Sequence, residues 1–333
     1  MDPREVNNIE SAREIIEQRN LNHVKIGVFD IDGILRGKYL AKEKFFSALT
    51  KGLGFCDVIL GWDSHDQLYD NVRVTGWHTG YPDSQVRILP QTCREIPWEG
   101  NMLLFLGEFQ GPHERVCPRS VLRRTLARAE AMGFNVFAGF EYEFFVFKET
   151  PESIRQKKYQ NLTPLQPGCF GYSILRDTVE SEFYHELLDT CRAMDMSLEG
   201  LHEETGPGVL EAAIGVDTGL NAADKGALFK TFSKILAQKK GMLDICNELG
   251  NGTVKITTRQ TFQLHGIQKK GLIESINQIN KYAMDTIAAC GEALLMASTA
   301  PQRRRRARCE RAAWSRSAVM VSGVRNGTVN CAR

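Results

Sequence analysis

Two glutamates, Glu141 and Glu143, lie in the otherwise apolar and aromatic stretch FEYEFFVF at 140–147. Side chains alternate faces along a strand, so both carboxylates are expected on one face, with Phe140, Tyr142 and Phe144 on the other. Two ionised carboxylates this close repel each other unless a cation, a shared proton or water lies between them. The pair predicts a metal site or, more simply, a solvated face or salt bridges to some of the 42 basic residues.

More acids lie in the stretch LHEETGPGVLEAAI, which has the pattern of two strands joined by a Gly-Pro-Gly turn. It contains Glu203, Glu204 and Glu211, and the last of these interrupts the apolar run VLEAAI. A buried carboxylate is unfavourable without a cation or hydrogen-bond donors. If this hairpin lies beside the first strand, Glu143, Glu203 and Glu211 converge, with Glu141 close by. Oxygen ligands of this kind suit Mg²⁺ or Mn²⁺ and, through the metal, a polyphosphate.

The helices and strands that position these acids can be predicted from the spacing of apolar residues and from turn residues. The first hundred residues alternate short strands with turns and one helix, which is typical of a small α+β domain. Amphipathic helices are predicted at 118–133, 180–194 and 221–241, and a strand at 101–109. A long polar loop begins with GWDSHD, and loops of this length are usually functional or disordered.

Composition limits the class of protein. The chain has 333 residues, of which 42% are apolar, and no apolar run reaches the roughly 18 residues that a membrane helix needs. Its start is charged and helical in period, unlike a signal peptide. None of the nine cysteines stands in a C-x-x-C spacing, which favours a reduced, cytoplasmic location.

From about residue 21 to 243 the chain resembles glutamine synthetases and the related γ-glutamylpolyamine synthetases. The matching stretches are FDIDGILRGKYL, GWDSHDQLYDN, FEYEFFVF, LTPLQPGCFGYSILRD, HEETGPGVLEAAI and ADKGALFKTFSKILAQKKGM. The resemblance implies a small β-grasp N-terminal domain joined to a catalytic α/β domain. It also implies assembly of identical subunits into rings, with active sites shared between neighbours.

The resemblance implies roles for individual residues. Glu143, Glu203 and Glu211 match the ligands of one divalent metal, and Glu141 matches one ligand of a second. The implied reaction is ATP-dependent: the side-chain carboxylate of glutamate is phosphorylated, and ammonia or another amine displaces the phosphate. An aspartate of the N-terminal domain helps to activate the amine in this family, and Asp63 is the candidate here.

The resemblance to this family stops near residue 243. The histidine expected to complete the second metal site has no counterpart, nor do the arginines that hold the substrate carboxylate and the phosphates of ATP. Such groups contribute orders of magnitude to phosphoryl transfer. We therefore expect a ligase whose activity is impaired, and the alternative is a non-catalytic subunit or relic of the same family.

Residues 242–291 resemble another family, the sirohaem-dependent sulfite or nitrite reductases. The match is carried by ELGNGTVKITTRQTFQLHGI, and we read its stretch 255–265 as one strand with a polar, basic face that includes His265. The cysteines that bind the iron–sulfur cluster in that family are absent, and Cys290 matches no such ligand. A fragment of this size is not expected to bind the cofactor.

From Glu292 onward the chain has nine arginines, no lysine and two acids, a charge of +7 within a chain of net charge +2. This tail suits nucleic-acid binding or a disordered segment without function, and we favour disorder because the rest of the chain carries no basic excess. The expected fold is α+β with an incomplete catalytic domain. The expected parts are an N-terminal domain at 1–110, a partial catalytic domain at 111–243, the reductase-like fragment at 244–291 and the tail at 292–333.

Overall fold

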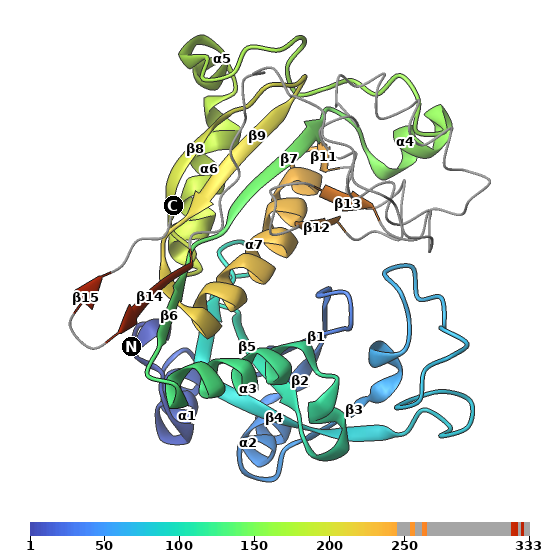
Figure 1. The fold of residues 1–333 in the computed structure, drawn as a ribbon, viewed down its shortest axis with the longest axis vertical. Coiled ribbons are helices and arrows are strands. Elements are labelled where there is room, and N and C mark those ends of the chain that lie inside the picture. Colours follow the sequence, from blue (N-terminus) through green and yellow to red (C-terminus); the bar gives the residue numbers. More distant parts are fainter. Residues whose placement is uncertain (245–253, 257–261, 265–320, 326–327, 330–333) are drawn as a thin grey trace, which may run out of the picture.

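The computed structural model describes residues 1–244 and four short segments beyond them, at 254–256, 262–264, 321–325 and 328–329. The described part is a mixed α/β architecture whose sheets are covered by helices (Figure 1). Within these residues no helix is both long and apolar enough to cross a membrane.

The N-terminal sheet has five strands in the order β2-β1-β5-β4-β3 and occupies the lower half of Figure 1. Its two central strands, β1 and β5, run parallel, and the other neighbours run antiparallel. The strands are β1 (His23–Phe29), β2 (Leu35–Ala41), β3 (Leu53–Cys56), β4 (Asp83–Glu95) and β5 (Leu103–Phe109). The helical segments around them are η1 (Pro3–Glu5), α1 (Ile9–Gln18), α2 (Lys42–Lys51), η2 (Asp57–Leu60) and η3 (Gly111–Arg115).

Two helices close one face of this sheet. The side chain of Asn8 accepts a hydrogen bond from the amide of Ser11 and so caps the start of α1. Ile15 and Ile16 of α1 are fully buried. Phe45 of α2 packs on Phe105 of β5, with ring centroids 4.8 Å apart. The apolar spacing of these two helices therefore builds the core under the N-terminal sheet.

The second sheet holds the acidic stretches and has the order β11-β7-β9-β8, with antiparallel neighbours throughout. Its strands are β7 (Glu141–Phe147), β8 (Leu198–Glu203), β9 (Val209–Ile214) and β11 (Leu243–Asp244). The helices α6 (Ser181–Ala193) and α7 (Gly219–Lys239) lie against it (Figure 1). Tyr142 and Phe144 of β7 contact Phe229 of α7, with ring centroids 5.3 and 5.9 Å apart. The aromatic face of β7 is thus the buried one, as its alternation predicts.

A third sheet has the order β10-β6-β14-β15. It consists of β6 (Asn135–Ala138), β10 (Asp217–Thr218), β14 (Val321–Arg325) and β15 (Thr328–Val329). The remaining helices are α3 (Pro118–Ala131), α4 (Pro151–Lys157) and α5 (Ile174–Val179). The three long helices α3, α6 and α7 begin and end within two residues of the bounds that periodicity predicts.

Short strands are described within the last ninety residues. Strands β12 (Val254–Ile256) and β13 (Phe262–Leu264) pair antiparallel, so they are not parts of the one continuous strand expected at 255–265. Residues 321–325 form β14 and pair with the edge of β6. An unpaired strand edge readily accepts another strand. The described residues do not include His265, Cys290 or most of the predicted reductase-like fragment at 244–291 and tail at 292–333.

A buried ionic network joins the two halves of the described chain. Arg119 of α3 donates to Asp224 of α7 at 2.9 Å, and its Nη1 lies 3.6 Å from Glu108 of β5. Glu108 is 1% exposed and also pairs with Arg87 at 2.8 Å and Arg123 at 3.1 Å. Burial opposes ionisation of Glu108, but these arginines hold its pKa below the ordinary value. The network therefore fixes α3 and α7 on the N-terminal sheet.

Candidate metal centre

A row of three polar side chains crosses the second sheet on the face opposite its aromatic core. Glu211 of β9 lies directly across from Glu143 of β7 on one side and from His202 of β8 on the other. Directly opposed residues in an antiparallel pair share a face. Glu141, two residues before Glu143, lies on the same face because side chains alternate.

Three residues come close enough to bind one cation. Ligand atoms of His202, Glu204 and Glu211 all lie within 4.8 Å of one another. Nε2 of His202 is 3.2 Å from Glu204 and 3.8 Å from Glu211. Glu204 follows the last residue of β8, and the amide of Thr205 donates to its Oε2 at 3.0 Å. Both glutamates are only 6% exposed.

The electrostatics of this cluster favour a cation. Burial, and then the charges of Glu143, Glu141 and Glu204, raise the pKa of Glu211 to about 7. Without a cation, Glu211 therefore takes up a proton far more readily than an exposed glutamate does. Carboxylate oxygens with one imidazole suit Mn²⁺ well and Mg²⁺ through the oxygens. The residues present therefore fit a divalent ion.

An aromatic side chain covers the histidine of this cluster. The ring of Tyr172 stacks on His202, with centroids 4.4 Å apart and planes 11° from parallel. The charge of Glu204, followed by burial, raises the pKa of the Tyr172 phenol. The phenol therefore stays protonated beside the carboxylates and can act as a hydrogen-bond donor to them.

The structure does not bring Glu203 to this cluster. Glu203 lies opposite Leu210, so its side chain is on the core face of the sheet. It is 5% exposed, and within the described part of the chain its Oε1 has no hydrogen-bond partner. Burial, and then the charge of Asp177, raise the pKa of Glu203. The hydroxyl of Tyr184 on α6 is also buried without a hydrogen-bond partner among the described residues.

Replacing Glu203 by Gln is therefore expected to stabilise the metal-free protein at pH 7 by about 1 kcal/mol, because the amide brings a donor and no charge. Because the folded pKa of Glu203 is raised, the penalty is absent below the unfolded value of 4.5, grows as the pH rises above it and is complete above the folded pKa. The gain from the amide should therefore be largest at high pH and shrink as the pH falls toward 4.5. Urea unfolding at several pH values, with EDTA present, measures it.

The matched control for this change is Glu199→Gln, because Glu199 is an exposed acid on the same strand. It is expected to change the free energy of unfolding by less than about 0.5 kcal/mol. A Glu203→Gln protein that is less stable than the parent chain at pH 7 would contradict the assignment of Glu203 to the core face.

Asp63 lies elsewhere in this chain. It is in the loop after η2, which extends from the N-terminal sheet at the lower right of Figure 1, while β7 and β9 cross the upper half. Its Oδ1 accepts hydrogen bonds from the amides of His65 at 2.8 Å and Gln67 at 3.0 Å. Within one chain, Asp63 therefore holds its own loop and does not meet the carboxylates.

The sequence analysis assigned no role in this cluster to His202, Glu204 or Tyr172, although it named Glu204 as an acid of the hairpin. The sequence held a signal for His202 and Glu204, because they are two residues apart, as Glu141 and Glu143 are. Residues with this spacing on a strand lie on the same face. Whether Glu203 or Glu204 faces the cluster depends on the residue at which β8 ends. No pattern in the sequence indicated that Tyr172 stacks on the histidine.

Comparison with known proteins finds similar sequences over most of the described chain. Residues 115–246 match the family model described as glutamine synthetase, catalytic domain. The chain is 48% identical over 223 residues to type-1 glutamine synthetase 2 of Dictyostelium discoideum, covering 66% of this chain and 43% of that protein. This part of the chain belongs to the glutamine synthetase family.

Other members of the glutamine synthetase family are also similar. A glutamate–isopropylamine ligase of a Pseudomonas species is 31% identical, with 69% of this chain and 51% of that protein covered. A gamma-glutamylethanolamide synthetase of Streptomyces coelicolor is 27% identical over 70% of this chain and 52% of that protein. The chain thus spans about half the length of the curated relatives it matches.

Solved structures share the fold. The cryo-EM structure of Plasmodium falciparum glutamine synthetase matches with a TM-score of 0.59 at 15% identity, covering 73% of this chain and 51% of that one. A crystal structure described as a novel glutamine synthase homolog matches with a TM-score of 0.53 at 20% identity, over 67% and 50% of the two chains. Residues 236–282 match the family model of the nitrite/sulfite reductase ferredoxin-like half domain, so both predicted resemblances are found.

Proposed function

We propose that this chain is an ATP-dependent glutamate–amine ligase of the glutamine synthetase type, impaired in turnover. The observation that carries the proposal is the cluster of His202, Glu204 and Glu211 within 4.8 Å, with Glu143 directly across from Glu211. Its substrates are glutamate, ATP and ammonia or another amine. The relatives include a glutamate–isopropylamine ligase and a gamma-glutamylethanolamide synthetase. Their names differ in the amine, so the amine that this chain would use is not specified by similarity.

Each residue of the cluster has a role in this proposal. Glu143, Glu204 and Glu211 would hold one Mg²⁺ or Mn²⁺ beside His202, and Glu141 would contribute to a second. When bound, such an ion would neutralise charge on the phosphoryl oxygens of ATP. Glu211 releases its proton when the site fills, and Tyr172 keeps the imidazole of His202 in place by stacking.

The remaining features of the family are proposed for this chain as well. The N-terminal sheet corresponds to a β-grasp-like domain over 1–110, followed by a partial catalytic domain over 111–243. In a ring of identical subunits, Asp63 would serve the carboxylate cluster of a neighbouring chain and help to activate the amine there. The setting proposed is the cytoplasm, where glutamate and ATP are available.

The test is formation of γ-glutamyl hydroxamate from glutamate, ATP and hydroxylamine by the full chain with Mn²⁺. We expect slow product formation that disappears in Glu143→Gln and persists in Glu199→Gln, which removes an exposed carboxylate of the same type. The loss in Glu143→Gln is expected to be about 100-fold or more, because the metal and its ligands supply most of the stabilisation of the developing charge.

The opposite result has a clear meaning. A chain that binds Mn²⁺ but forms no hydroxamate is a non-catalytic member of the family, which was the alternative derived from the sequence. Co-purification with an active relative then distinguishes a structural subunit from a relic. The reductase-like resemblance supports no second function here, because most of that segment lies outside the described residues.

A further inference from the structure

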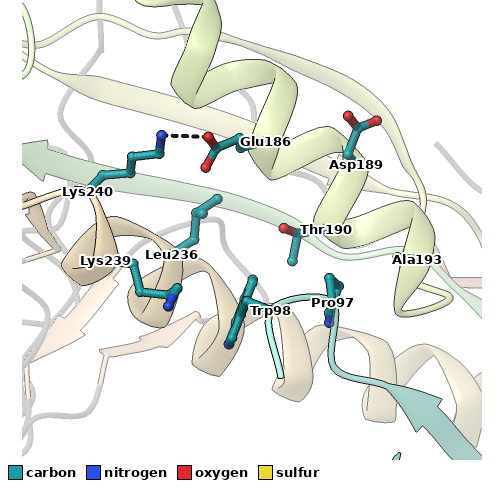
Figure 2. Close-up of a pocket in the computed structure, with 9 residues that line it drawn as sticks. All are labelled: Pro97, Trp98, Glu186, Asp189, Thr190, Ala193, Leu236, Lys239 and Lys240. Atoms are coloured by element: carbon teal, nitrogen blue, oxygen red, sulfur yellow. Dashed lines mark ion pairs between the residues drawn. The ribbon is translucent and has the colours of Figure 1, made fainter. Parts of the chain in front are cut away.

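A cavity of about 430 Å³ lies between helices α6 and α7 and the turn that connects β4 to β5 (Figure 2). It is separate from the carboxylate cluster and shares no residue with it. Cavities of about 300–1,000 Å³ are typical of sites for small molecules. Its walls are Pro97, Trp98, Glu186, Asp189, Thr190, Ala193, Leu236, Lys239 and Lys240.

One wall of this cavity is flat and aromatic. The indole of Trp98 packs on Phe232 of α7, with ring centroids 6.0 Å apart, so the core holds it in place. Leu236 of α7 is 3% exposed and forms the apolar surface beside it. A fixed indole next to a leucine is a surface on which a second aromatic ring can stack.

The charges around the cavity are unequally compensated. Lys240 pairs with Glu186 at 2.5 Å and with Glu182 at 2.6 Å. Asp189 pairs with Arg192 at 2.8 Å. Lys239 forms no ion pair within the described part of the chain, and its ammonium lies over the Trp98 ring, 6.0 Å from the ring centre. The charged group beside the indole is therefore a cation, while Glu186 and Asp189 also line the cavity.

We propose that this cavity binds a small aromatic carboxylate. The ring of the ligand stacks on Trp98 and contacts Leu236, while its carboxylate accepts charge-assisted hydrogen bonds from Lys239. Thr190, which also lines the cavity, carries a hydroxyl on the α6 side (Figure 2). A cation of the same shape is repelled by Lys239 when its ring stacks on Trp98, and an apolar molecule without a carboxylate lacks the charged contact.

Isothermal titration calorimetry of the full chain with indole-3-acetate and with tryptamine tests the proposal. The two probes share the indole ring and differ in the sign of their charge. We expect saturable binding of indole-3-acetate with a Kd on the order of 1 mM, given its size, and no saturable binding of tryptamine. Equal affinity for the two probes would overturn the proposal, as would no binding of either.

Two variants locate the binding. Ala193→Phe fills the cavity from an exposed position of α6 and should weaken binding of indole-3-acetate at least about tenfold by steric exclusion, whereas Ala131→Phe on α3 should not. Lys239→Gln should weaken it about threefold to fivefold, as expected for a partly exposed ion pair, and Lys51→Gln on α2 should not. Binding that survives both Ala193→Phe and Lys239→Gln lies elsewhere, and the assignment to this cavity would then be wrong.

Discussion

A Glu204→Gln variant is expected to bind Mn²⁺ roughly 100-fold more weakly than the parent chain, while Glu203→Gln is expected to stay within about threefold of it. The two glutamates are neighbours in the sequence, and each variant replaces one carboxylate by an amide of the same shape. Both variants remove one negative charge from the hairpin, so a difference between them reports which of the two positions binds the metal. Titration of the metal-free protein, followed by calorimetry or by the electron paramagnetic resonance signal of free Mn²⁺, measures both affinities.

The physical reason is the register of β8 against β9. His202 lies opposite Glu211 and Glu203 lies opposite Leu210, so alternate residues of β8 point to the face that holds Glu211 and to the core. Glu204, just after the strand, approaches His202 on the face of Glu211, at 3.2 Å. An amide at position 204 keeps one oxygen ligand but loses the charge that attracts the cation.

The control for this prediction is Glu211→Gln, which should weaken Mn²⁺ binding at least as much as Glu204→Gln, because Glu211 occupies the centre of the row. If Glu203→Gln loses the metal and Glu204→Gln keeps it, the ligand set implied by family resemblance at the sequence level is the right one. The strand register would then have to shift by one residue in the metal-bound protein.

Much of the fold was predictable because long amphipathic helices and alternating strands carry strong periodic signals. The helix at 118–133, for example, opens with Pro118 and closes at Gly133, whose φ is +84°. The aromatic face of β7 followed from alternation alone, and its contact with Phe229 confirms it. Short strands such as β12 and β14 form only when they pair with another strand, and no local sequence pattern identifies the partner strand.

The site was predictable only in part, for a related reason. Spacing two apart on β7 placed Glu141 and Glu143 together, and hairpin pairing placed Glu211 across from Glu143. The choice between Glu203 and Glu204 depended on which residue of the turn ends β8, and sequence-based boundaries are uncertain by a few residues. The sequence shows which residues carry the charges, but the pairing of β7, β9 and β8 in the tertiary structure decides which of these residues lie together.

An Asp224→Ala variant is expected to lose about 3–5 kcal/mol of stability, the largest effect of any single change considered for the described residues. Asp224 is 3% exposed and accepts two hydrogen bonds from Arg119 at 2.9 Å, while Arg119 is itself 7% exposed. Without Asp224, the guanidinium of Arg119 stays buried, with Glu108 at 3.6 Å as its remaining acidic partner. Urea unfolding followed by far-ultraviolet circular dichroism measures the loss.

The matched control is Asp189→Ala, because Asp189 also pairs with an arginine at 2.8 Å but both partners are about two-thirds exposed, at 68% and 70%. Water screens that pair, so its loss should change the free energy of unfolding by less than about 1 kcal/mol. A similarly small effect of Asp224→Ala would mean that α7 is not held by this ion pair.

A double variant separates the cost of an unpaired charge from the value of the contact. Arg119→Met combined with Asp224→Leu removes both charges and fills their space with apolar atoms, which often leaves stability close to that of the parent protein. Glu108 keeps Arg87 and Arg123 as partners in this variant. We therefore expect the double variant to be more stable than Asp224→Ala alone. If it is instead less stable, the hydrogen bonds between α3 and α7 themselves hold these helices against the N-terminal sheet.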